Sequence, residues 1–203
     1  MEERIAAVGE REWMLPQEAT PIRLMATIWA DVAGIHDDLG TAADLTAWLA
    51  AAGVEHGGQR AAVHELELAR RLRDALRRLA AQVTGDEREA ARSATPEVRQ
   101  AVSDLNQVVA HLPGPRITFV DGVLRETSSS GASALTAGLA RIAHESIELL
   151  TGPEADKLRA CYAPGCVLYF AKTHPRREWC SVTCGNRVRA ARHYDKVRST
   201  RGI

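Results

Sequence analysis

Four cysteines lie close together in one short segment toward the C-terminal end of this 203-residue chain. Cys161 and Cys166 form one pair, thirteen residues follow, and Cys180 and Cys184 form the second pair. Zinc binds soft, deprotonated sulfur at about 2.3 Å, and two short pairs can fold around one ion with little strain. The spacing therefore predicts one structural Zn²⁺ held by four thiolates. Such a closed site leaves no open position for water, which disfavours hydrolytic zinc chemistry.

Other uses of these cysteines stay open as alternatives. Structural disulfides need an oxidising compartment, whereas the opening segment 1–5 lacks the layout of a signal peptide and predicts a cytoplasmic protein. A redox-active pair needs two residues between its cysteines, and neither pair has that spacing. His174 lies between the two pairs and is a further candidate ligand. Oxidation that pairs the cysteines and releases zinc is another alternative.

A basic, amphipathic helix is predicted directly after the second cysteine pair. At 100° per residue, one face of this helix gathers three cations within about 60° of one another: Arg189, Arg192 and Lys196. The opposite side carries Ala190, Tyr194 and Val197, which we expect to pack on the zinc knuckle or on the larger part of the chain. Three more arginines lie nearby in the sequence: Arg176, Arg177 and Arg187.

Charge divides the chain into two parts. Residues 1–156 carry 15 basic and 24 acidic residues, a net charge of −9, and residues 157–203 carry 11 basic and 2 acidic residues, a net charge of +9. Four thiolates and one Zn²⁺ would lower the second value to +7, which still suits a phosphate-binding surface. DNA is therefore the predicted partner of the six cations named above. The alternatives are RNA, docking of the helix on the acidic part, and docking on a partner protein.

Local signals predict a mainly α fold of the α+β class. Helices are expected over 41–53, 61–83, 95–112 and 135–152, each supported by apolar residues at steps of three and four. Three of them also have start or stop signals: a capping box of Thr41 and Asp44 with Gly53 as the stop, Thr95-Pro96 as a start, and Gly152 as a stop. A β-hairpin is expected over 117–126, with Asp121-Gly122 as its type I′ turn. The apolar stretch 22–35 is interpreted as a helix. We expect a helical domain with one hairpin over 1–152 and a four-cysteine zinc finger ending in a basic helix over 153–203.

The arginine-rich stretch of the helix predicted over 61–83 has two interpretations. Its cations are Arg70, Arg71, Arg73, Arg77 and Arg78. Glu67 and Asp74 lie four positions from several of them, and such helical pairs are worth roughly 0.2–0.5 kcal/mol each. A solvated, salt-bridged face is therefore favoured over a nucleic-acid-binding face.

The sequence offers no sign of an enzyme or of a membrane protein. It contains no glycine-rich phosphate loop, no GxSxG and no HExxH motif, and no apolar run long enough to span a bilayer. The cluster His36-Asp37-Asp38 is interpreted as a polar loop, because adjacent side chains point in different directions. We therefore expect a non-enzymatic protein.

The segment Trp179-Cys180-Ser181-Val182-Thr183-Cys184-Gly185-Asn186-Arg187 closely resembles the CGNR zinc finger, which is named for the string found here at 184–187. In that family the finger follows an α-rich domain called ABATE, and the larger part of this chain is similar to it in layout. The resemblance implies zinc ligation by the four cysteines and a role as a stress-induced transcription regulator. It implies structural or nucleic-acid roles for Trp179, Asn186 and Arg187. The larger domain would sense an unknown small-molecule effector or form a homodimer.

Overall fold

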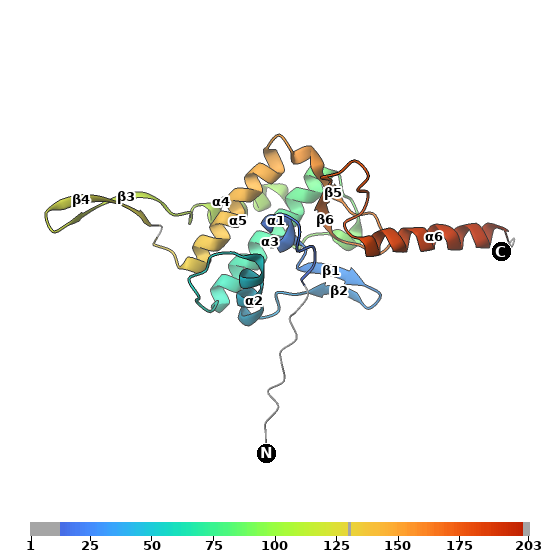
Figure 1. Ribbon diagram of the computed structural model, residues 1–203, viewed down its shortest axis with the longest axis horizontal. Coiled ribbons are helices and arrows are strands. Elements are labelled where there is room, and N and C mark those ends of the chain that lie inside the picture. The colour runs from blue at the N-terminus through green and yellow to red at the C-terminus, as the bar shows by residue number, and fades with distance from the viewer. Residues whose placement is uncertain (1–12, 130, 201–203) are drawn as a thin grey trace, which may run out of the picture.

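The computed structural model describes residues 13–129 and 131–200 (Figure 1). The opening segment 1–5, on which the signal-peptide prediction depends, lies outside these residues. Within these described residues, five helices form the body: α1 (Thr20–Met25), α2 (Ala42–Ala52), α3 (Val63–Thr84), α4 (Val98–Val109) and α5 (Ala134–Thr151). None of the helices in this part of the chain is both long and apolar enough to cross a membrane.

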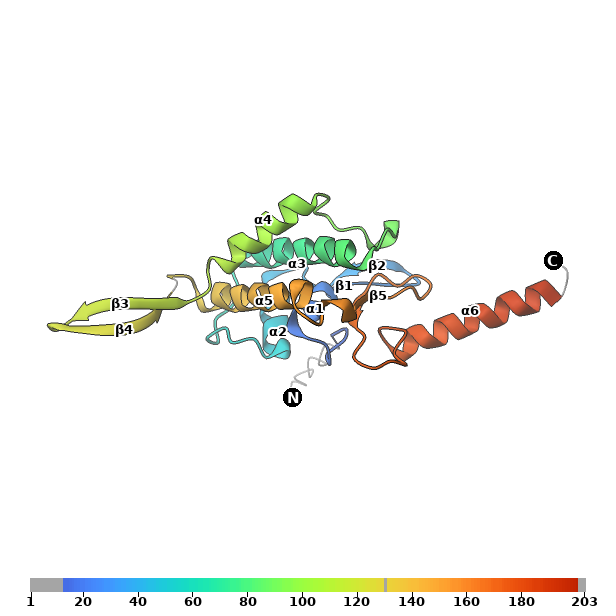
Figure 2. The same cartoon turned by 90° about the horizontal axis from the view of Figure 1, so that it is seen from above.

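The long helix α3 organises the core. It contacts α1, α2, α4, α5 and the first strand of the cysteine-rich region, and Figure 2 shows α4 and α5 running along it. Leu66, Leu72 and Leu76 are buried along one stripe of α3, as the apolar steps of three and four predict. Trp48 and Leu49 of α2 are also buried in this core. The mainly α fold predicted from the sequence is confirmed.

The helix ends show which local signals set the boundaries. Thr41 and Asp44 form the expected capping box at the start of α2: the Asp44 backbone N–H donates to the Thr41 hydroxyl at 3.2 Å, and the Thr41 N–H donates to the Asp44 carboxylate at 2.8 Å. Gly53 ends this helix in the left-handed conformation with φ 71°. The proposed start of α4 at Thr95-Pro96 is wrong, because that helix begins at Val98. The Pro96 carbonyl instead accepts a hydrogen bond from Arg78 at 2.7 Å.

The helix predicted over 22–35 is also wrong in its second half. Helix α1 ends at Met25, and the chain then forms an antiparallel hairpin of β1 (Ile28–Asp31) and β2 (Gly34–Asp37). The turn explains the change: the Asp31 carboxylate accepts the Ala33 N–H at 2.7 Å, and Gly34 has φ 127°, which a helix cannot accommodate. Trp29 stacks on His36 across the two strands, with ring centroids 4.2 Å apart.

The hairpin predicted over 117–126 is present and longer than expected. Strand β3 (Gly114–Val120) pairs with β4 (Val123–Ser129), and Asp121 and Gly122 have φ 51° and 78°, as a type I′ turn requires. Figures 1 and 2 show this hairpin projecting from one end of the helical body. We call it the arm, residues 114–129.

The cysteine-rich region is built onto the helical body. Strand β5 (Leu158–Ala160) pairs antiparallel with β6 (Tyr169–Ala171), and helix α6 (Val182–Thr200) follows. The short 3₁₀ turns η1 (Glu89–Ala91) and η2 (Ala155–Lys157) complete the elements. Leu158, Tyr169 and Phe170 are buried in the same apolar cluster as α1, α2 and α3. The body of the zinc region therefore shares one core with the helices.

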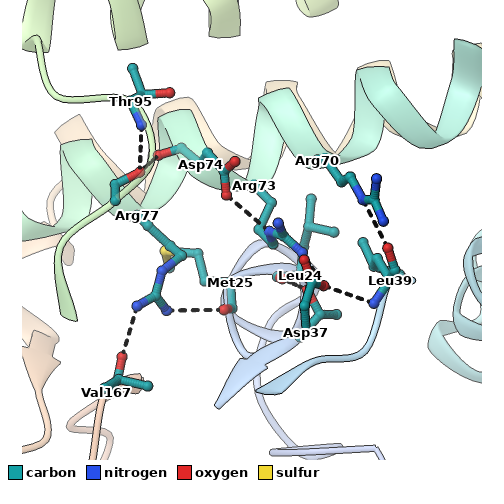
Figure 3. Close-up of polar contacts among 12 residues, drawn as sticks. Leu24, Met25, Asp37, Leu39, Arg70, Arg73, Asp74, Arg77, Thr95 and Val167 are labelled. Carbon is teal, nitrogen blue, oxygen red and sulfur yellow. Dashed lines mark hydrogen bonds and ion pairs between the residues drawn. The ribbon is translucent and has the colours of Figure 1, made fainter. Parts of the chain in front are cut away.

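Of the five arginines of α3, Arg71 is exposed as the solvated face expected from the sequence requires, but most of the others are not. Arg73 and Arg77 are buried, and Arg73 donates to the Asp37 carboxylate at 2.6 Å (Figure 3). Arg77 donates to the carbonyls of Met25 and Val167, each at 3.2 Å. Arg70 donates to the Leu39 carbonyl at 2.8 Å. Arg70, Arg73 and Arg77 therefore hold other segments of the chain against α3. The interpretation of these residues as a solvated, salt-bridged face is wrong.

The cluster His36-Asp37-Asp38 does not form a shared site. His36 and Asp37 lie on strand β2 and not in a loop, and the His36 ring pairs with Asp31 at 2.8 Å. Asp37 accepts from Arg73 and from the Leu39 N–H at 2.9 Å. Each group therefore has its own structural partner.

Candidate metal centre and basic surface

The four cysteine thiols converge on one buried point. All four Sγ atoms lie within 4.8 Å of one another, and all four residues are buried. The Sγ atoms of Cys166 and Cys180 are 3.8 Å apart, and those of Cys180 and Cys184 are 3.4 Å apart. A tetrahedron with metal–sulfur bonds of about 2.3 Å has edges of about 3.8 Å, so this cluster fits zinc. His174 is exposed and lies outside the cluster.

Three local structures place the thiols. Cys161 follows β5, and its N–H donates to the Leu168 carbonyl at 2.9 Å. A tight turn brings Cys166 back, because Gly165 has φ 71° and the Cys166 N–H donates to the Ala163 carbonyl at 2.9 Å. Cys184 lies in the first turn of α6, where its N–H donates to the Ser181 hydroxyl at 3.2 Å. Helix α6 begins at Val182, so the basic helix predicted to follow the second cysteine pair already includes Cys184.

Arginine side chains offset the negative charge of the thiolates. The Arg187 guanidinium donates to the Cys184 sulfur at 2.9 Å. Hydrogen bonds from the neighbouring thiols and from Arg187 lower the pKa of Cys184 and thereby favour its thiolate form. Deprotonated sulfur is the form that binds zinc. Arg187 is thus part of the metal site rather than a cation directed away from it.

A second arginine ties the zinc region to the helical body. Arg88, which follows α3, donates to the carbonyls of Cys161 and Cys166 at 2.5 and 2.6 Å. Asp86 holds this guanidinium through ion pairs of 2.7 Å and also accepts from the Tyr169 hydroxyl at 2.9 Å. Burial would raise the pKa of Asp86, but the hydrogen bonds from Arg88 and Tyr169 lower it overall. The loop of the first cysteine pair is therefore fixed by residues of the body.

Arg177 has a similar structural position. It pairs with the buried Glu18 at 2.5 Å, donates to the carbonyls of Ala171 and Cys180 at 3.0 Å each, and lies over the Phe170 ring. Glu18 also accepts the Ala171 N–H at 3.1 Å. The guanidinium of Arg177 is thus occupied by acceptors of its own chain, although the sequence pattern grouped it with the cations expected to meet phosphate.

The remaining cations line the outer side of the zinc region. Arg176, Trp179, Gly185 and Arg189 border a shallow depression of about 470 Å³ at the base of α6. Gly185 lies close to the Trp179 ring here: a Cβ at this position would be 3.3 Å from the ring, a tight contact that the ring would have to relieve by a small shift. Arg192 and Lys196 continue along α6 on the face that carries Arg189. All three of these helix cations are exposed.

Helix α6 projects away from the body (Figures 1 and 2). Its first turns pack inward through Cys184 and Val188, which are buried. Beyond them most of the expected packing of the apolar side is absent: Ala190 is exposed, Tyr194 is 66% exposed, and Val197 alone of the three is partly buried. The alternative in which the basic helix docks along the acidic body is therefore wrong for this structure. Both sides of the distal helix are open to solvent.

Comparison with known families gives a consistent result. The family model of ABATE, described as "Putative stress-induced transcription regulator", matches residues 18–153, and that of the CGNR zinc finger matches residues 157–197. The chain belongs to the ABATE family. A search of curated proteins finds no match. Both family descriptions concern a regulator and a zinc finger, and neither describes an enzyme.

In this ABATE protein the four cysteines bind one structural Zn²⁺, as the family match and the thiol geometry together show. Sequence reasoning found these ligands but missed the residues that hold them against the body: Glu18, Arg77, Asp86, Arg88 and Tyr169. A sequence signal existed only for the aromatic residue, since an isolated tyrosine in a short strand beside the knuckle suggests packing there. The carbonyl acceptors carry no side-chain signature.

Proposed function

We propose that this ABATE protein is a transcription regulator that binds duplex DNA through the exposed face of α6. The observation that carries the proposal is the projecting helix with Arg189, Arg192 and Lys196 on one face. Arg176 and the Trp179 ring extend the same surface at its base. Phosphate contacts of this kind supply most of the affinity of non-specific DNA binding.

The zinc site supports this role as a structural element. Four thiolates complete the coordination of a structural zinc, so no open position is left at which the metal could activate water. The knuckle fixes the direction in which α6 leaves the body, since Cys184 lies in the first turn of that helix. We therefore propose a cytoplasmic, non-enzymatic regulator in which zinc orients the DNA-binding helix.

The first prediction concerns the salt dependence of DNA binding. Replacing Arg189, Arg192 and Lys196 with alanine removes up to three phosphate contacts. The slope of log K against log salt is about −0.9 per contact, so it should become less steep by up to about 2.7. Fluorescence anisotropy on a generic duplex at several salt concentrations measures this slope.

The matched control removes the same charge elsewhere. Arg71, Arg125 and Arg141 are exposed on α3, the arm and α5, and their replacement with alanine should leave the slope close to that of the wild type. An unchanged slope in the α6 variant would exclude this face as the contact surface. Tighter binding of duplex RNA than of duplex DNA would favour the RNA alternative over the proposal.

A docking role for α6 is the second candidate function. The exposure of Tyr194 favours it, because aromatic residues are enriched at protein interfaces and this one packs on nothing in the body. Zinc-loaded protein that binds no duplex at low salt, together with intact helical structure, would support a protein partner for α6 and contradict the DNA proposal.

A further inference from the structure

The arm exposes several large apolar side chains to solvent. Ile117 and Phe119 on β3 are 73% and 71% exposed, and Leu124 on β4 is 65% exposed. The register places Phe119 opposite Leu124, so all three side chains lie on one face. Val120 and Val123 at the tip are about half exposed on the other face. A two-stranded hairpin is marginally stable in water, so this arm needs a partner.

The two edges of the arm differ in how they are protected. Strand β4 carries Arg125 and Glu126 side by side, and charged residues on an edge strand discourage pairing with another strand. Strand β3 carries no charge from Ile117 to Val120. In an antiparallel pair of strands, every second residue directs its backbone N–H and C=O groups toward the partner strand. Because Val120 and Val123 form the last pair before the turn, Ile117 and Phe119 direct these groups away from β4. Pro115 has no N–H to donate, so the stretch of the β3 edge open to strand addition runs from Arg116 to Val120.

The β3 edge is complementary to itself. If a second β3 runs antiparallel to the first with Thr118 opposite Thr118, each Ile117 faces Phe119 of the second copy. A branched aliphatic residue opposite an aromatic ring is a favourable cross-strand pair, and the twofold axis forms this pair twice. No charge meets a like charge in this register, because Arg116 lies opposite Val120 of the second copy. The result is a four-stranded sheet, which is independently stable where a two-stranded hairpin is not.

We propose that two copies of this chain associate through their β3 edges, in antiparallel register centred on Thr118. Pairing through the edges places Ile117, Phe119 and Leu124 of both copies on one face of the joint sheet, where side chains on neighbouring strands shield part of one another from water. Figures 1 and 2 show the arm and α6 at opposite ends of the body, so arm pairing leaves both basic helices exposed. The proposal is independent of what α6 binds.

Sedimentation equilibrium of the full-length, zinc-loaded protein over a concentration series tests the proposal. The wild type is expected to be a dimer. Ile117→Lys and Phe119→Glu, made singly, each place a charge opposite an apolar residue and should raise the dimer dissociation constant by at least about tenfold. The double variant brings the new lysine opposite the new glutamate of the second copy at both pairs, so dimerisation should return.

Val123→Lys is the control, since Val123 lies on the outer strand β4 and takes no part in the Ile117–Phe119 pairs, so this variant should leave the dimer intact. All these positions are exposed and far from the core, so zinc content and helical circular dichroism verify that the variants fold. A monomeric wild type at every concentration would overturn the proposal. A double variant as monomeric as the single variants would overturn the β3 register.

Discussion

Replacing Cys180 with serine is expected to release the zinc and to destabilise the helical body as well as the finger. Cys180 is buried at the centre of the thiol cluster, 3.8 and 3.4 Å from the sulfurs of Cys166 and Cys184. Structural zinc contributes about 10–16 kcal/mol of apparent binding free energy in small zinc peptides, so losing one thiolate removes a large part of what folds the knuckle. The free energy of unfolding should fall by several kcal/mol.

Elemental analysis and urea unfolding measure the two effects. We expect one zinc per wild-type chain, and well under one per chain in the Cys180→Ser variant after dialysis. His174→Ala is the control: this histidine lies between the cysteine pairs in sequence, but it is exposed and outside the cluster, so zinc should be retained. Full, tightly held zinc in Cys180→Ser, or loss of zinc in His174→Ala, would contradict the four-thiolate assignment.

The damage should reach the body because the finger has no separate core. Cys161, Cys166, Cys180 and Cys184 belong to the same buried cluster as the leucines of α2 and α3. The division of the chain into segments with net charges of −9 and +9 suggests two independent parts. Charge composition does not show whether the two parts share one apolar core. Unfolding of the wild type is therefore expected to be a single transition, followed equally by helical circular dichroism and by tryptophan fluorescence, to which Trp48 of α2 and Trp179 of the zinc region both contribute.

The sequence predicted those features whose causes are local. The capping box at Thr41 and Asp44 needs only three residues of spacing, and the thiol cluster needs two close pairs and a short loop. The arm follows from Asp121-Gly122, since a type I′ turn requires positive φ at both positions. Each of these patterns restricts the backbone within a few residues, so tertiary contacts had little room to change the outcome.

The arginines of α3 show where such reasoning fails. Asp74 lies four residues from both Arg70 and Arg78, and that spacing is typical of a solvated pair on a helix surface. The structure uses these cations for partners distant in sequence: Arg70 donates to the carbonyl 31 residues before it, and Arg77 to one 90 residues after it. Every residue has a backbone carbonyl, so the sequence does not show which carbonyl will accept a hydrogen bond from a given arginine.

Replacing Arg77 with methionine is expected to cost about 2–4 kcal/mol of unfolding free energy. Arg77 is 2% exposed and donates to carbonyls of three separate segments, at Met25, Ala91 and Val167. Methionine fills similar volume but leaves these buried acceptors unpaired, at about 1–3 kcal/mol each. Part of that cost is offset, because burial disfavours the charged guanidinium and lowers the pKa of Arg77. Urea unfolding measures the net change.

The contacts of Arg77 also predict that replacing it weakens zinc binding. Val167 follows the ligand Cys166 directly, so a chelator should remove zinc faster from Arg77→Met than from the wild type. Arg71→Met is the matched control on the same helix, since Arg71 is exposed, and it should change stability by no more than about 0.5 kcal/mol. Arg77→Lys keeps the charge, but one ammonium cannot span three segments, so stability should recover only partly. A fully stable Arg77→Met with unchanged zinc release would mean that the body holds the knuckle through Arg88 and Glu18 alone.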